Sequence, residues 1–172
     1  VAAYGAQNEG DARRAIDLLR DAGEIANRQG DPMVTQSHVR TANDSVVKNR
    51  VLEIVDGMSV QKKLSLYAAS LVAKENDDVA PSPVVYDIYK ILCEGSDAEM
   101  YTQETVNSHI NKAGTYGVLE SERSSGGFKS GVHLLFKFNE PVAAVLETLS
   151  EDSRLKSIPA EELSEVVKRR LR

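Results

Sequence analysis

Residues 102–138, TQETVNSHINKAGTYGVLESERSSGGFKSGVHLLFKF, carry the clearest pattern in this sequence. Apolar residues recur with helical spacing in the first part of the stretch: Val106, Ile110 and Ala113. After that helix the period changes from 3.6 to 2, which predicts short strands over 118–123 and 132–138. The glycine-rich residues 124–131 between them suit the tip of a hairpin. The stretch therefore predicts a helix followed by a β-hairpin.

Two further helices are predicted upstream of this stretch. One begins after Ser59, a residue that suits an N-cap, and ends in the polar run 74–78. The next starts at Ser82-Pro83, where the missing N–H of proline costs nothing. Three helices followed by a hairpin is the order of a winged helix, which is a variant of the helix-turn-helix. After the hairpin, Pro141 opens another helix, and a last amphipathic stretch follows.

The N-terminal part of the chain predicts helices alone. Residues 11–29 carry a broad apolar face and end at Gly30-Asp31-Pro32. Thr35 suits the N-cap of a second pattern that runs to Gly57, as one bent helix or as two. The predicted fold is mainly α with a small β-hairpin. It comprises a helical segment over 1–57, a winged helix over 58–150 and a C-terminal helical extension over 151–172.

The third helix and the hairpin carry the side chains that would suit nucleic acid. Opposite its apolar stripe the helix exposes amides, hydroxyls and one cation: Gln103, Asn107, Ser108, Asn111, Lys112 and Thr115. Amides and hydroxyls suit base edges in a major groove, and a lysine suits a phosphate. The hairpin adds Arg123, Lys129 and Ser130 among small residues that allow close approach of the backbone. We predict a DNA-binding surface here, with a solvated surface or a protein contact as the alternatives.

The overall charge argues in the opposite direction. The 172 residues have a formal net charge of -5, and the predicted winged helix is itself net negative, whereas phosphate neutralisation needs Lys and Arg. Screening over about 8 Å at physiological salt still allows a local positive face to act. A high-salt source, in which acidic surfaces are common, is a second interpretation.

Other sites are not supported by the sequence. The single cysteine, Cys93, excludes an internal disulfide and predicts a reducing, cytoplasmic setting. No apolar run approaches the ~20 residues that cross a bilayer, so no membrane partner is expected. His38, His109 and His133 lack metal-ligand spacing, so no metal site is predicted. His38 is expected on a helix surface and His133 on the outer face of a strand.

One motif resembles a known family. Residues 10–20, GDARRAIDLLR, begin with a Gly-Asp-x-Arg that resembles the second sensor motif in the helical lids of AAA-type ATPases. The longer string through Ala26 is similar to archaeal origin-recognition initiators of the Orc/Cdc type. In that family a phosphate-loop domain precedes the lid, and a winged helix that binds origin DNA follows it. The resemblance makes 1–57 an AAA+ lid and matches Arg13 to the arginine that senses the γ-phosphate of ATP.

The resemblance also implies a recognition helix over 102–116 and a wing over 122–131. Relatives often have several arginines in the wing, whereas the basic residues in the wing of this sequence are Arg123 and Lys129. Double-stranded origin DNA is the implied partner, a replicative helicase is a further candidate, and a nucleoid-associated location is expected. The oligomeric state stays open.

The sequence contains no Gly-x-x-x-x-Gly-Lys-[Ser/Thr] phosphate loop. The helical start close to Val1 predicts a C-terminal fragment, catalytically silent and without a cofactor, whose parent protein binds ATP and Mg. Two alternatives to an initiator remain at this point. One is a transcriptional regulator that dimerises through the N-terminal helices, and the other is a winged-helix module that binds only proteins.

Overall fold

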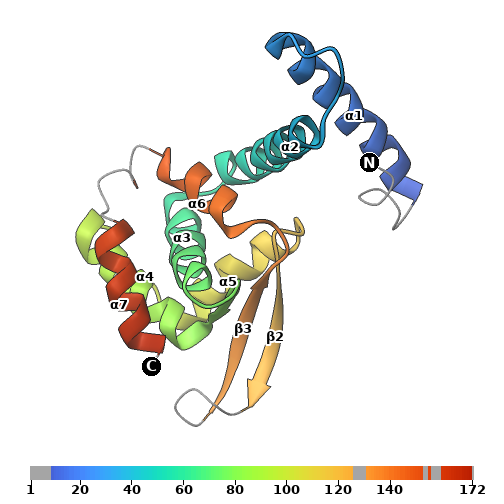
Figure 1. Ribbon diagram of the computed structural model, residues 1–172. Helices are drawn as coiled ribbons and strands as arrows, with labels where there is room; N and C mark the ends of the chain where they lie inside the picture. The colour runs from blue at the N-terminus through green and yellow to red at the C-terminus, as the bar shows by residue number, and fades with distance from the viewer. Residues whose placement is uncertain (1–8, 126–130, 153–154, 156–159, 172) are drawn as a thin grey trace. The chain divides into compact units, whose positions relative to one another are not determined.

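The computed structural model describes residues 9–125, 131–152, 155 and 160–171, with the backbone alone described at 9–14 and 160–162. Helices dominate these residues, as the sequence predicts (Figure 1). The chain divides into two units, residues 1–50 and 51–172. Within the described parts of the chain, no helix is long and apolar enough to cross a bilayer.

The first unit is built on α1 (Glu9–Gln29) and the greater part of α2 (Gln36–Asp56). Among the side chains that the structure describes, one cluster of its buried core consists of Leu18, Ala22 and Ala42, with Ile25 and Val39 packed against them. α1 ends at Gly30, whose φ of 77° lies in the left-handed region that glycine adopts without strain. Where the sequence pattern up to Gly57 allowed one bent helix or two, the structure contains the single helix α2.

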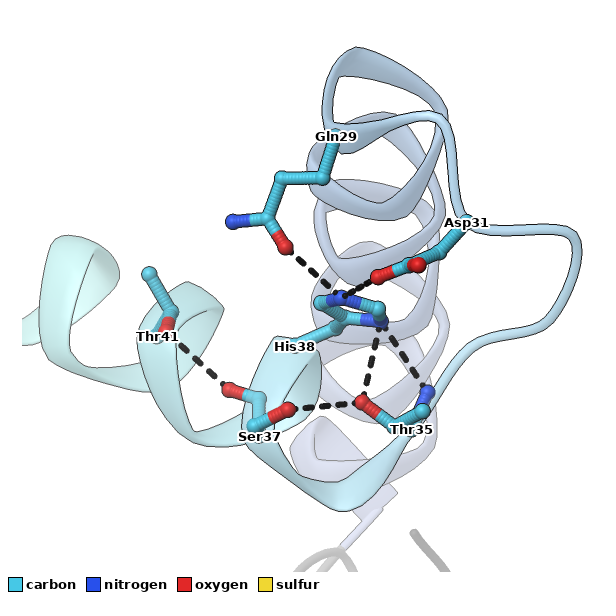
Figure 2. Close-up of polar contacts among 6 residues, drawn as sticks. All are labelled: Gln29, Asp31, Thr35, Ser37, His38 and Thr41. Carbon is cyan, nitrogen blue, oxygen red and sulfur yellow. Dashed lines mark hydrogen bonds and ion pairs between the residues drawn. The ribbon is translucent and has the colours of Figure 1, made fainter.

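His38 connects the two helices of this unit (Figure 2). The Thr35 backbone N–H donates to His38 Nδ1 at 3.1 Å, so the ring proton resides on Nε2. That nitrogen lies 2.9 Å from Gln29 Oε1 and 3.0 Å from Asp31 Oδ2. The ring is 3% exposed, so the prediction that His38 lies on a helix surface is wrong. The turn after α1 folds back over the first turn of α2, which helical periodicity does not reveal.

Replacing His38 by alanine should loosen the junction between α1 and α2. The substitution leaves the Thr35 N–H without its acceptor and removes the donor to Gln29 and Asp31, a loss of about 1–3 kcal/mol. Amide hydrogen exchange at the start of α2 should therefore accelerate by roughly five- to 150-fold. Ser45→Ala removes an exposed hydroxyl from the same helix and should leave exchange nearly unchanged. Equal rates in the two variants would show that His38 does not stabilise the junction.

The second unit contains the predicted winged helix. Its first three helices are α3 (Val60–Lys74), α4 (Ser82–Ser96) and α5 (Gln103–Gly114). Every residue of α3 from Leu64 to Ala73 is buried, and α3 packs against α4, α5 and α6 (Val142–Ser150). The predicted helix start at Ser82-Pro83 is confirmed, with the proline in the first turn. This order of three helices and a hairpin confirms the winged-helix fold.

The hairpin consists of β2 (Leu119–Ser125) and β3 (Val132–Phe138), which pair antiparallel and project away from the helices (Figure 1). A third strand, β1 (Val79–Pro81), pairs with the other edge of β3 and gives the sheet order β1-β3-β2. Phe136, in the central strand, is completely buried. β1 was not predicted, because three residues are too few to show a period of 2.

The C-terminal helix α7 (Ala160–Leu171) packs against α3 and α4. Two of its basic residues are engaged in ion pairs there: Lys168 Nζ lies 3.6 Å from Glu75, and Arg170 lies 3.0 Å from Asp87. Ahead of α7, Asp152 pairs with Lys63 of α3 at 2.7 Å. The residues after α6 therefore pack against the winged-helix unit and form ion pairs with it.

Candidate nucleic-acid interface

A groove of about 750 Å³ lies between α5 and the β2–β3 hairpin. Five of the residues predicted to bind DNA line it: Gln103, Asn107, Ser108, Asn111 and Arg123. The start of α4 and the first residues of β3 complete its walls. Helix and wing thus present their polar side chains to one shared space.

The orientation of α5 follows from its cap and its buried stripe. The Thr102 side chain accepts a hydrogen bond from the Thr105 backbone N–H at 3.3 Å, which fixes the start of the helix. Val106, Ile110 and Ala113 are completely buried. Because side chains three and four residues apart share a helical face, this burial turns the amide-bearing face toward the groove.

Asn107, which lines the groove, carries an unusual polar atom. Its Oδ1 is buried and has no hydrogen-bond partner among the residues that the structure describes. An unsatisfied buried acceptor of this kind costs about 1–3 kcal/mol. A base edge that offers both a donor and an acceptor, as adenine does in the major groove, would satisfy the amide.

Arg123 is the groove's cation. It is exposed on β2 and makes no ion pair within the described part of the chain. Its acidic neighbour Glu122 pairs with Lys137 across the hairpin at 2.6 Å, and Asn139 donates to Glu120 at 3.4 Å. Two of the carboxylates near the wing are therefore engaged within the protein, while the guanidinium stays available to an anion.

Glu104 is the acidic exception in this groove. It lines the cavity from the first turn of α5, and no described residue forms an ion pair with it. A carboxylate there is favourable to the helix, because the N-terminus of a helix carries positive partial charge. The same carboxylate would repel the phosphates of a duplex lying in the groove.

The structure does not bring every predicted site residue into this groove. Lys112 lines a different cavity, together with Lys62 and Thr115. Lys129 and Ser130 lie outside the described residues, and so does the side chain of Arg13, whose backbone belongs to α1. The predicted contacts of these three side chains stay predictions.

His109, also on α5, faces the protein. Its ring lies edge-on to Tyr101, with centroids 5.9 Å apart, and its Nδ1 is 3.4 Å from Ser65 Oγ. Burial lowers the pKa of His109, and the nearby charges of Lys62 and Lys112 lower it further. The ring is therefore neutral at pH 7. Across the described residues, no cluster of three or more potential metal ligands occurs.

Comparison with known families agrees with this architecture. Residues 1–44 match the family described as Cdc6 AAA+ ATPase-type lid domain. Residues 53–148 match the CDC6, C terminal winged helix domain. The two matches occur in the order in which the helical segment and the winged helix follow one another here.

Individual relatives point the same way. The chain is 42% identical over 160 residues to "ORC1-type DNA replication protein 14" of Haloarcula marismortui, covering 90% of this chain and 37% of that protein. It is 37% identical over 177 residues to "ORC1-type DNA replication protein 5" of Halobacterium salinarum, covering 100% of this chain and 41% of the relative. The chain thus spans about two-fifths of the length of these relatives.

A solved structure is also similar. The Aeropyrum pernix ORC1 protein, solved in complex with DNA, superposes with a TM-score of 0.74 at 31% identity, covering 92% of this chain and 41% of that one.

Proposed function

This chain belongs to the Cdc6 family of DNA-replication proteins, of which it carries the lid and the winged helix, and we propose that it binds duplex DNA at replication origins. The observation that carries the proposal is the groove in which α5 and the hairpin place Gln103, Asn107, Asn111 and Arg123 together. The DNA in the Aeropyrum pernix ORC1 structure supports the same class of ligand.

In this proposal α5 enters the major groove and the wing lies along the backbone. Gln103, Asn107 and Asn111 follow one another at intervals of four, so their amides reach successive base edges from one face of the helix. Ser108 adds a hydroxyl beside them. Arg123 contacts phosphate or the edge of a narrow minor groove, and Lys129 and Ser130 extend that contact at the tip.

The helical segment serves the nucleotide cycle of a longer protein in this proposal. Arg13 reaches the γ-phosphate of ATP that is bound with Mg by a phosphate-loop domain outside this sequence. The segment bounds that we propose are 1–57 for the lid, 58–150 for the winged helix and 151–172 for the extension. A replicative helicase is a further candidate partner of the assembled initiator.

Selection from a random duplex library tests the function. The chain should enrich a defined sequence and should bind it at least a hundredfold more tightly than a scrambled duplex of equal length. Binding without sequence preference would contradict origin recognition. Palindromic selected sites together with a dimeric chain would favour the regulator alternative, and an absence of duplex binding would favour a protein-interaction module.

Glu104→Gln should tighten duplex binding. Removing one groove carboxylate relieves repulsion worth about 1 kcal/mol at short range, so Kd should fall roughly fivefold at low salt and less at high salt. Fluorescence anisotropy at two salt concentrations measures this change. Glu147→Gln removes the same charge from α6, outside the groove, and serves as the control. Weaker binding by Glu104→Gln would instead assign Glu104 a contact with a base, such as the amine of cytosine.

A further inference from the structure

A second cavity, of about 650 Å³, lies within the 51–172 unit at the C-terminal end of α5. Its walls come from the end of α2, the start of α3 and the C-terminal end of α5. The residues that matter for its chemistry are Glu53, Lys62, Lys112, Thr115 and Tyr116. The start of α3 and the end of α5, which are distant in sequence, therefore each place one lysine in this cleft.

These two lysines differ from three ion-paired lysines of the same unit. Lys63, Lys137 and Lys168 each pair with a carboxylate at 4 Å or less. Neither Lys62 nor Lys112 makes an ion pair with any residue that the structure describes. Two unpaired ammonium groups in one cleft repel each other. One carboxylate, Glu53, also lines the cleft, so the net charge of these three side chains is positive. The cleft therefore favours an anion.

His109 provides a second indication that the two charges act on the same region. Lys62 and Lys112 both lower the pKa of this imidazole, in addition to the larger effect of its burial. The two ammonium groups are thus close enough to the same ring to influence its protonation. An anion held between them would offset that influence.

The position of the cleft on α5 identifies the anion. Lys112 directly follows Asn111 of the groove, so the two side chains diverge by about 100° around the helix axis. A helix that lies in a major groove about 12 Å wide has a sugar–phosphate backbone on each side. In the proposed placement of α5, with the hairpin along one backbone, the cleft about 100° away around the helix axis would face the other backbone.

We propose that the cleft between α3 and the end of α5 binds a phosphate of the duplex, with Lys62 and Lys112 as its ligands. This inference rests on the proposed function, because it places the contact on the DNA that α5 reads. The cleft adds affinity without sequence information, whereas the amides in the groove provide the discrimination. Lys62 thereby joins the DNA-binding surface, although nothing in its local sequence marks it.

The test is the double variant Lys62→Gln, Lys112→Gln, titrated with the selected duplex and with a scrambled duplex across a salt series. The slope of log Kd against log salt should fall by about two, and both duplexes should weaken by the same factor. Lys74→Gln removes one charge, as each of the two substitutions does, from the opposite end of α3, where the side chain is exposed and lines neither cavity, and should change nothing.

Two results would contradict the proposed phosphate site in the cleft without contradicting the proposed function: an unchanged salt slope, or a loss of discrimination between the two duplexes. If the unaltered chain did not bind duplex DNA, the proposed function would be wrong, and so would the phosphate site proposed in the cleft.

NMR titration of the His109 ring protons gives an independent readout. The double variant should raise the pKa of His109 in the free chain, because two positive charges have been removed. Adding duplex to the unaltered chain should also raise the pKa of His109, whereas inorganic phosphate at the same concentration should have little effect. An equal response to inorganic phosphate would identify a free-phosphate site, and no response to duplex would exclude a phosphate at this cleft.

Discussion

Replacing Arg123 and Lys129 together by alanine is expected to weaken duplex binding by about tenfold or more. Arg123 is the cation of the groove and has no ion-pair partner in the described residues, so its charge is available to DNA. Lys129 lies outside the described residues, and its place at the tip of the wing rests on the sequence. A side chain that reads DNA contributes about 1–3 kcal/mol, and each lost phosphate contact lowers the salt slope by about one.

Anisotropy titrations at several salt concentrations measure both quantities. Lys74→Ala removes one positive charge at the end of α3 and is the charge-matched control for Arg123→Ala alone; no loss is expected. Arg123→Ala alone should give a large part of the effect. If the double variant bound with unchanged affinity, the wing would have no part in DNA binding, and α5 alone would carry the contact.

Phe136→Ala is expected to destabilise the winged-helix unit by about 3–5 kcal/mol. Phe136 lies in the central strand of the sheet, opposite Ala80 of β1 and Ser121 of β2, and is completely buried. Truncating the ring leaves a cavity at the base of the hairpin. Such a loss is a large part of the stability of an ordinary domain.

Val132→Ala in the same strand provides the control. Val132 is 73% exposed, so its truncation should change stability by no more than about 0.5 kcal/mol. Urea unfolding followed by tyrosine fluorescence reports on this unit, because all tyrosines except Tyr4 lie within it. Similar midpoints for the two variants would contradict the assignment of Phe136 to the core.

The periodicity of the sequence was sufficient to predict the winged helix. Val106, Ile110 and Ala113 repeat over enough turns to define a buried face, and alternation in the sequence predicts β3, in which Phe136 is the buried residue. β1 has only three residues and forms by pairing with the edge of β3. Its formation therefore depends on a tertiary contact that the local sequence does not reveal. His38 shows the same limit, because its burial depends on a turn that folds over it.

The candidate site was partly predictable for the same reason. Residues four apart on one helix share a face, which is why Gln103, Asn107 and Asn111 were predicted together and line one groove. The role of Glu122 could not be predicted, because its pairing with Lys137 depends on the register of the hairpin. Lys62 was missed because its cleft joins elements that are far apart in sequence.

Chemical-shift mapping of the isotope-labelled chain with its selected duplex tests most directly whether α5 and the hairpin form the DNA-binding surface. The largest changes are expected at the amides and side chains that line the groove: Gln103, Asn107, Asn111 and Arg123. Weaker changes are expected at Lys62 and Lys112. Perturbations confined to α4 and α7, with none along the groove, would show that the duplex binds elsewhere and would contradict the proposed interface.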